Sequence, residues 1–300
     1  MALVSFSFLF SVILTPLSVL CAARIGAIDL PDGERKLHAH PTARLGGLAL
    51  FFAVFSASLL FLPATDVRAA LLSGGALLCV LGVSDDVFSL SPVLKLAAEG
   101  VIVFIPAAFS LYPRALTLGN LSFDLPEWAG IFFSAFLLVA LLNAYNLVDG
   151  VDMLASSEAI AAALALSLYA PASPVLLGAL LGFLPYNREA LALFSSEKMP
   201  TRSFLGDTGA LFIGYALGVL ALSQERFSLF MLLFFALPLY ELFSSFIRRA
   251  WRRQNPFKAD REHLHHRLEK KGYSPALAVL LLLLYALLFA SVGVLLREIF

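Results

Sequence analysis

The sequence predicts an all-α, polytopic integral membrane bundle of about ten transmembrane helices, and two observations carry that prediction. First, 60% of the 300 residues are apolar and only 14% are charged, whereas a water-soluble fold needs a more highly charged surface. Second, a bilayer core of about 30 Å requires about 20 apolar residues per helix, and ten segments are candidates. They lie near residues 3–23, 45–63, 67–84, 93–112, 128–147, 153–170, 173–186, 208–222, 227–247 and 275–296.

The distribution of lysine and arginine predicts how these helices cross the bilayer. The odd-numbered loops between the segments, counted together with Lys95 at the start of the fourth segment, hold 17 of the 21 lysines and arginines. The even loops and the two ends, counted together with Arg68 at the start of the third segment, hold the other four. The positive-inside bias therefore puts the odd loops in the cytoplasm and both termini outside. No internal repeat or soluble domain interrupts the chain, so residues 1–300 form one polytopic domain. The net charge of zero gives no general attraction for nucleic acid.

The first of these cytoplasmic loops combines cations with a double glycine. Lys36, His38 and Arg44 precede Gly46 and Gly47, which open the second segment. This composition suits a phosphate or an anionic headgroup that binds there. A turn anchored to lipid headgroups is the structural alternative.

An aspartate pair ends the third segment. Asp85 and Asp86 follow a long apolar run and therefore lie at a helix end beside the membrane. Adjacent carboxylates raise each other's pKa unless a cation neutralises them, and a divalent metal ion does this well. A solvated helix terminus is the alternative. Lys95, in the next segment, lies near the same surface, where it would hold a phosphate or extend to the headgroups.

Four polar residues at the end of segment 128–147 form the next motif. A helix that continues through this region would carry them on one face, because they recur every three residues. Capping an ordinary helix end needs one such group rather than four, so the motif predicts a binding site. The four residues are Asn143, Asn146, Asp149 and Asp152.

Asp207 lies between Gly206 and Gly209, where segment 208–222 begins. Glycines let the backbone approach a phosphate or metal ion closely, and a helix N-terminus favours anions. A simple N-cap is an equally open interpretation of this aspartate.

A histidine cluster follows the ninth segment. His263, His265, His266 and the adjoining Arg267 bring three imidazoles into four residues. Neutral histidine ligates metals and protonated histidine binds phosphate. A structural zinc site would need cysteine partners or a fourth ligand nearby, and neither cysteine is near, so phosphate handling is favoured. A solvated basic loop is the alternative.

Glu241 lies inside the ninth segment, three residues after Pro238. Intramembrane acids are costly and usually functional, so Glu241 is a candidate substrate-binding residue. A kink that carries it to the cytoplasmic boundary is the alternative.

Taken in order, these motifs resemble the signature series of the polyprenyl-phosphate N-acetylhexosamine-1-phosphate transferases. That family includes the phospho-MurNAc-pentapeptide translocase and the bacterial UDP-GlcNAc:undecaprenyl-phosphate GlcNAc-1-phosphate transferases. The His-x-His-His form resembles the GlcNAc branch more closely, and the MurNAc-pentapeptide branch stays the alternative. The family usually has Gly where this chain has Met153 and Ser where it has Ala210, which bears on substrate specificity. The matching residues are Arg35-Lys36-x-His38 with Pro41 and Gly46-Gly47, Asp85-Asp86 with Lys95, Asn143 to Asp152, Gly206-Asp207-x-Gly209 and His263-x-His265-His266.

The resemblance implies Mg²⁺-dependent transfer of N-acetylhexosamine 1-phosphate, most closely GlcNAc 1-phosphate, from a UDP-sugar to polyprenyl (undecaprenyl) phosphate, with release of UMP. This is the initiating step of a cell-envelope glycan such as lipopolysaccharide or teichoic acid. It implies a multi-pass protein of the inner (plasma) membrane with the active site facing the cytoplasm. The expected partners are UDP-N-acetylhexosamine, polyprenyl phosphate and membrane lipids, with Mn²⁺ as the alternative ion and a homodimer as an open alternative.

The resemblance also implies roles for individual residues. Asp207 is the principal Mg²⁺ ligand, with Asn146 and Asp86 in support. Asp85 deprotonates or orients the polyprenyl phosphate, and Lys95 neutralises phosphate charge. The expected catalytic set is Asp85, Asp86, Lys95, His263, His265 and His266; the expected substrate-binding set is Lys36, His38, Arg44, Asn143, Asn146, Asp149, Asp152, Arg267 and Glu241.

Two other classes compete with this interpretation. A secondary transporter would also be polytopic, but it should place polar residues near the bilayer midplane, often in paired broken helices. Here the polar residues fall at segment ends on one side. A membrane zinc enzyme using the histidine cluster is the third possibility and predicts stoichiometric zinc.

Overall fold

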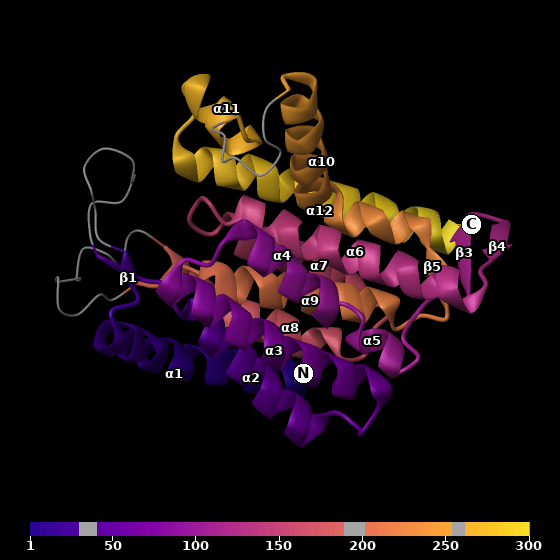
Figure 1. Ribbon diagram of the computed structural model, residues 1–300, viewed down its shortest axis with the longest axis horizontal. Helices are drawn as coiled ribbons and strands as arrows, with labels where there is room; N and C mark the ends of the chain where they lie inside the picture. Colours follow the sequence, from indigo (N-terminus) through magenta and orange to yellow (C-terminus); the bar gives the residue numbers. More distant parts are fainter. Residues whose placement is uncertain (30–40, 189–201, 254–261, 300) are drawn as a thin grey trace.

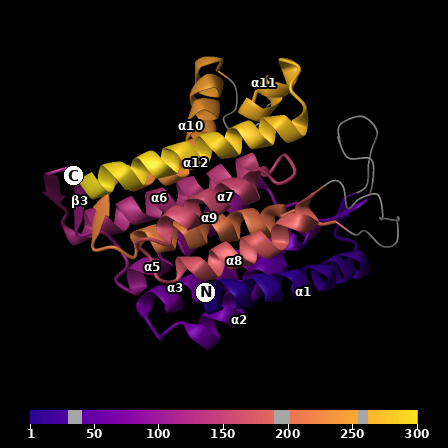
Figure 2. The same ribbon diagram turned by 180° about the vertical axis from the view of Figure 1, so that it is seen from behind.

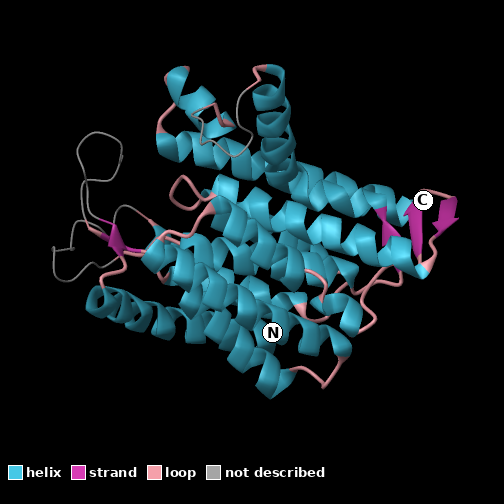
Figure 3. Ribbon diagram, viewed as in Figure 1, coloured by secondary structure: helices cyan, strands magenta, loops and turns pink. Residues whose placement is uncertain are grey.

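The computed structural model describes residues 1–29, 41–188, 202–253 and 262–299 (Figure 1). As the sequence predicts, the described chain is mostly helical (Figure 3). Five of its helices are long and apolar enough to cross a membrane: Ala2–Ile25, Asp66–Phe88, Glu127–Val148, Leu229–Trp251 and Pro275–Ile299. Shorter apolar helices fill the places of the remaining predicted segments except residues 93–112.

The bounds of most helices agree with the segments that the sequence predicts. The α-helical elements are α1 (Ala2–Ile25), α2 (Gly46–Phe61), α3 (Asp66–Phe88), α4 (Pro92–Ile102), α5 (Ile105–Ala108), α6 (Glu127–Val148), α7 (Leu154–Leu166), α8 (Ser173–Phe183), α9 (Gly206–Leu222), α10 (Ala236–Trp251), α11 (Leu264–Lys270) and α12 (Pro275–Ile299). The 3-10 turns are η1 (Leu184–Asn187) and η3 (Leu229–Phe235).

Two predicted spans are not single α-helices. Segment 93–112 divides into α4 and α5, because Pro106 has no N–H to continue the α4 ladder and instead occupies the first turn of a new helix. Segment 227–247 begins as strand β5 (Arg226–Ser228) and passes through η3 before α10 starts. The prediction of one continuous helix was wrong for segment 93–112, whereas η3 and α10 together form the helical segment Leu229–Trp251, which is long and apolar enough to cross a membrane.

The structure also contains short strands that the sequence patterns did not predict. Strand β1 (Ile28–Asp29) pairs antiparallel with β2 (Thr42–Ala43), with Ile28 opposite Ala43. A second sheet has the order β4-β3-β5: β3 (Ala115–Leu118) pairs antiparallel with β4 (Leu121–Asp124) and parallel with β5. Figure 1 shows β1 at one end of the bundle, with β3, β4 and the C-terminus at the opposite end.

Helix α9 forms the centre of the bundle. From Thr208 to Leu222 every residue is buried, as expected for a helix surrounded by others. Its neighbours include α3, α6 and α2, and the view from behind shows α8 and α7 lying along it as well (Figure 2).

Glycines allow this close packing where α9 begins. A Cβ on Gly47 of α2 would lie 2.0 Å from the nitrogen of Gly209, and a Cβ on Gly82 of α3 would lie 2.3 Å from the Cα of Thr208. Because the obstructing atoms are backbone, neither position tolerates a side chain without moving a helix. The glycines therefore bring the start of α9 against the end of α3.

Candidate active site

A carboxylate at the end of α3 accepts hydrogen bonds from the start of α9. Oδ1 of Asp86 accepts the backbone N–H of Asp207 at 3.0 Å, and Oδ2 accepts the N–H and the hydroxyl of Thr208 at 3.1 and 2.7 Å. Asp86 is only 7% exposed. Gly206 has φ +70°, and a Cβ there would lie 2.1 Å from the carbonyl oxygen of Arg44. The chain therefore needs glycine to turn into α9 at this point.

Lys95 on α4 joins the two carboxylates that face the site. Its ammonium donates to Oδ2 of Asp85 at 2.8 Å and also to Oδ1 of Asp207. The same oxygen of Asp207 accepts the Nδ2 amide of Asn146 from α6. Four predicted residues from four different helices, α3, α4, α6 and α9, thus meet around one cationic centre.

Asn143, one turn before Asn146, is held from α4. Its amide donates to Oε2 of Glu99 at 2.7 Å and to the carbonyl of Val139 at 2.9 Å. Glu99 is 1% exposed, and its other oxygen has no hydrogen-bond partner within the described chain. Glu99 follows Lys95 by four residues, so both side chains lie on one face of α4.

The two remaining aspartates of the motif have different surroundings. Burial raises the pKa of Asp149 well above its usual range, and the charges of Asp207, Asp86 and Asp152 raise it further. Asp152 pairs with the buried guanidinium of Arg202 at 2.7 Å. Such a concentration of carboxylates favours a bound cation, because a cation lowers their mutual repulsion.

The first loop and the segment before α9 form a single backbone assembly. The N–H of Gly46 donates to the carbonyl of Phe204 at 3.2 Å, and that of Gly47 donates to Leu205 at 2.9 Å. The side chain of Arg44 pairs with Asp29 of β1, and its carbonyl oxygen lies beside Gly206 at the start of α9. Lys36 and His38 lie outside the described residues.

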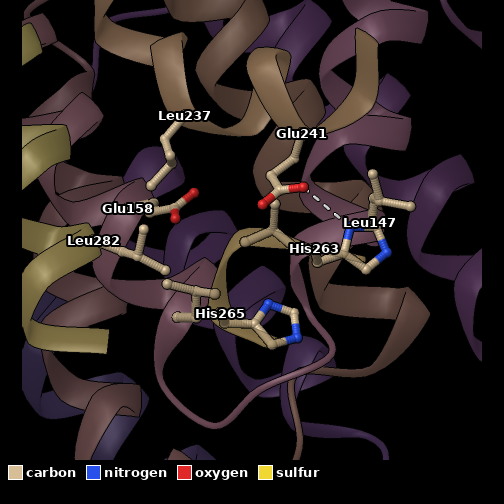
Figure 4. Close-up of a pocket in the computed structure, with 9 residues that line it drawn as sticks. Leu147, Glu158, Leu237, Glu241, His263, His265 and Leu282 are labelled. Atoms are coloured by element: carbon tan, nitrogen blue, oxygen red, sulfur yellow. Dashed lines mark hydrogen bonds and ion pairs between the residues drawn. The ribbon is translucent and has the colours of Figure 1, made fainter. Parts of the chain in front are cut away.

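His263 and His265 belong to a second group of residues, which lines a pocket (Figure 4). Glu241 on α10 uses both carboxylate oxygens there: Oε2 lies 3.1 Å from Nδ1 of His263, and Oε1 accepts the N–H of Leu264 at 2.5 Å. The rings of His263 and His265 stack with centroids 5.8 Å apart. Leu147 and Val148 of α6 also line this pocket, so consecutive residues of α6 serve the carboxylate cluster and the histidine group.

The three histidines differ in exposure and in partners. His265 is 3% exposed, and burial, followed by the neighbouring His266 and His263, lowers its pKa to about 4. It is therefore neutral at physiological pH. His266 lies 3.1 Å from the Glu269 carboxylate, and Arg267 is exposed on α11.

Sequence reasoning missed three buried polar residues near these groups: Glu99, Glu158 and Arg202. Glu158 on α7 is 2% exposed, faces the histidine pocket, and has no hydrogen-bond partner for either oxygen among the described residues. The criterion that identified Glu241, an acidic residue inside an apolar segment, would also have identified Glu99 and Glu158. The position of Arg202 opposite Asp152 depends on tertiary contact across 50 residues and has no local signal.

The carboxylate cluster fits a magnesium ion. Over the described residues, no three histidine, cysteine or acidic side chains converge as a preformed metal cage. Mg²⁺ does not need one, since it is usually held by one or two carboxylates together with water and substrate phosphates. The Lys95 ammonium already bridges Asp85 and Asp207, which shows that these two carboxylates converge on one cation.

Comparison with protein families agrees with this geometry. Residues 68–225, more than half of the chain, match the model described as glycosyl transferase family 4. The matched region contains the aspartate pair, Lys95, the Asn143 to Asp152 motif and Asp207.

Full-length relatives extend the similarity to nearly the whole chain. A Bacillus subtilis (strain 168) protein named "Probable undecaprenyl-phosphate N-acetylglucosaminyl 1-phosphate transferase" is 31% identical, over 97% of this chain and 83% of the relative. The decaprenyl-phosphate N-acetylglucosaminephosphotransferase of Mycolicibacterium smegmatis is 32% identical, over 88% and 74%. The undecaprenyl-phosphate alpha-N-acetylglucosaminyl 1-phosphate transferase of Salmonella typhi is 28% identical, over 96% and 81%.

Proposed function

The chain belongs to glycosyl transferase family 4, and from that premise we propose that it transfers N-acetylglucosamine 1-phosphate from UDP-N-acetylglucosamine to a polyprenyl phosphate. Relatives named for this transfer to undecaprenyl or decaprenyl phosphate support the reaction class. The observation that carries the assignment is the meeting of Asp85, Lys95 and Asp207 from three helices. A phosphotransfer site needs such a centre, because two anionic reactants must approach each other.

The reaction that we propose is a direct displacement. An oxygen of the lipid phosphate attacks the phosphorus that carries the sugar, and the bond from that phosphorus to the bridging oxygen breaks. The products are polyprenyl diphospho-N-acetylglucosamine and UMP. Asp85 lies at the end of α3 and accepts a hydrogen bond from the Lys95 ammonium, an arrangement suited to orienting the lipid phosphate beside a positive charge.

The carboxylate cluster supplies the place for a Mg²⁺ ion. Asp207 and the amide oxygen of Asn146 would hold it, with Mn²⁺ as the alternative ion. When bound, the ion neutralises phosphate charge as the leaving UMP develops its own. Lys95 would add a second positive charge, and Asp149 and Asp152 would hold the uridine half of the donor.

We also propose that this site faces the cytoplasm of a cell whose inner membrane the chain spans about ten times. The ends of α3 and α6 and the starts of α4 and α9 gather at the same end of the bundle. The lysine and arginine bias of the sequence assigns that end to the cytoplasm and both termini to the outside.

Labelling of single cysteines tests this orientation. In a chain whose Cys21 and Cys79 are replaced by serine, Lys271→Cys should react only with a membrane-permeant reagent. Asn120→Cys, in the turn between β3 and β4, should react with an impermeant reagent added outside. The reverse pattern would contradict the proposed topology.

A donor panel tests the function. Purified protein with Mg²⁺ and undecaprenyl phosphate should release UMP from UDP-N-acetylglucosamine, and UDP-MurNAc-pentapeptide should give little release. Preference for the pentapeptide donor would assign the chain to the other branch of the family. If no UDP-sugar gives UMP release, the proposal is contradicted, and a secondary transporter becomes the favoured interpretation.

A further inference from the structure

The contacts of Asp86 conflict with the expectation that it ligates metal. Its carboxylate accepts three hydrogen bonds, all from Asp207 and Thr208 at the start of α9. A carboxylate offers about four acceptor positions, so at most one is left for an ion. At 7% exposure the side chain is also largely covered.

These contacts are those of a helix cap contributed by another helix. The first N–H groups of a helix have no partner within it. Leu205, the residue before α9, makes no side-chain cap. Asp86 supplies the missing acceptors from α3, and its negative charge also suits the positive end of the α9 dipole.

The glycines around Asp86 indicate that this cap has a fixed geometry. A Cβ on Gly206 would lie 2.8 Å from Oδ2 of Asp86, and a Cβ on Gly82 would lie 2.5 Å from the nitrogen of Thr208. A side chain at either glycine would therefore collide with the Asp86 carboxylate or with the α9 backbone that it caps. Asp207, whose own N–H is one of the donors, has its backbone set by this contact.

We infer that Asp86 is a positioning residue, which fixes the first turn of α9 so that the Asp207 carboxylate faces Lys95 and Asn146. The inference rests on the proposed function and refines it, because it divides the aspartate pair. Asp85 faces the reactants, whereas Asp86 acts through Asp207. Misplacing a reacting group by about 1 Å costs on the order of 100-fold in rate, so loss of the cap should lower kcat severely.

The experiment compares Asp86→Asn and Asp86→Ala with Asp207→Asn, and Asp66→Asn is the matched control. Asp66 is an exposed aspartate in the first turn of α3, at the opposite end of the helix. Three quantities are measured on the full chain in detergent: hydrogen exchange of a peptide covering residues 206–212, kcat for UMP release, and the Mg²⁺ concentration that gives half-maximal activity.

Loss of a cap speeds local opening by roughly 3- to 30-fold, so Asp86→Ala should exchange faster over residues 206–212. Its kcat should fall about 100-fold, and the half-maximal Mg²⁺ concentration should rise with it, because a residue that orients a metal ligand is typically worth about 10- to 100-fold in metal affinity or activity. Asp86→Asn keeps one acceptor oxygen and should rescue part of both losses. Asp66→Asn should match the wild type.

The opposite pattern would overturn the inference. If Asp86 ligates Mg²⁺ instead, both Asp86 variants should raise the half-maximal Mg²⁺ concentration while exchange over residues 206–212 in Mg²⁺-free buffer stays at the wild-type rate. Hydrogen exchange does not depend on the reaction, so failure of the proposed function would be visible separately, as a wild type that transfers nothing.

Discussion

The Lys95 ammonium donates a hydrogen bond of 2.8 Å to the Asp85 carboxylate, although the two residues belong to different helices. The same ammonium contacts Asp207, 112 residues further along the chain. The Lys95 side chain thus places a positive charge between the Asp85 and Asp207 carboxylates. Its side chain is 15% exposed, so solvent screens these contacts only in part.

Replacing Lys95 by methionine should remove this charge and leave two carboxylates facing each other. Loss of one preorganised charge contact at a reacting centre lowers kcat by about 100- to 1,000-fold, and we expect a fall of that size in UMP release. Lys95→Arg keeps the charge and should retain more activity, while Lys271→Met, at an exposed lysine, should behave as wild type. Activity of Lys95→Met within threefold of the wild type would refute its role.

Glu241 should act by holding the histidine segment in place. Both of its oxygens contact the start of α11, and leaving such buried donors without an acceptor costs about 1–3 kcal/mol. Glu241→Ala should therefore speed hydrogen exchange of residues 262–270 and lower activity, whereas Glu241→Gln keeps an acceptor and should stay near the wild type. Tyr240→Phe, on the exposed side of α10, is the control. Equal exchange in the Ala and Gln variants would count against this docking role.

Acid should destabilise the protein partly through His265. The pKa of His265 in the fold is about 4, below the value near 6.5 of an unfolded chain. The unfolded chain therefore binds the extra proton first, and this contribution to stability, a few kcal/mol at most, is lost as the pH falls from about 6.5 to about 4.

A variant without the titrating ring provides the test. His265→Gln should show a shallower fall of melting temperature across that interval, because the neighbouring residues His263, His266, Glu241 and Glu158 are the same in both proteins. If the melting temperatures of the variant and the wild type fall equally between about pH 6.5 and about pH 4, His265 does not contribute to acid destabilisation in this way.

Met153 occupies a backbone conformation that favours glycine, with φ +65°. Its N–H donates to Oδ1 of Asn187 at 2.9 Å, which holds the strained turn. Left-handed geometry costs a non-glycine residue about 1–2 kcal/mol, partly offset by the backbone entropy that glycine loses on folding. Met153→Gly should raise the melting temperature by a few degrees, and Met153→Ala should not. Equal melting temperatures for these two variants would contradict the interpretation.

Local patterns predicted much of the fold, and particular residues show where they stop. The apolar runs located nearly all the helices, and the aspartate pair does end α3. Pro106 lies within segment 93–112, but the prediction of a single span rested on the apolar length of the segment alone, so the break between α4 and α5 was missed. Helical periodicity is a property of one segment, and it carries no information on the strand pairing that joins β3 to β5 across about a hundred residues.

The sequence predicted which residues belong to the site, but it did not predict which partner each of them contacts. Spacing placed Asn143 and Asn146 on one face of α6, and the structure adds that one faces Glu99 and the other faces Asp207. Nothing in the pair Asp85-Asp86 distinguishes its members. The direction of each carboxylate is set by the glycines that let α9 approach α3, which is a tertiary effect.

The central claim is that one cation at Asp207 serves the transfer, and the most direct measurement is Mg²⁺-dependent UMP release by Asp207→Asn. Purified variant and wild type are assayed with UDP-N-acetylglucosamine and undecaprenyl phosphate across a Mg²⁺ titration, with melting temperature as the check on folding. The variant should keep its melting temperature and lose about 1,000-fold in rate at every Mg²⁺ concentration. Turnover near the wild-type rate, with the same Mg²⁺ dependence, would contradict the account.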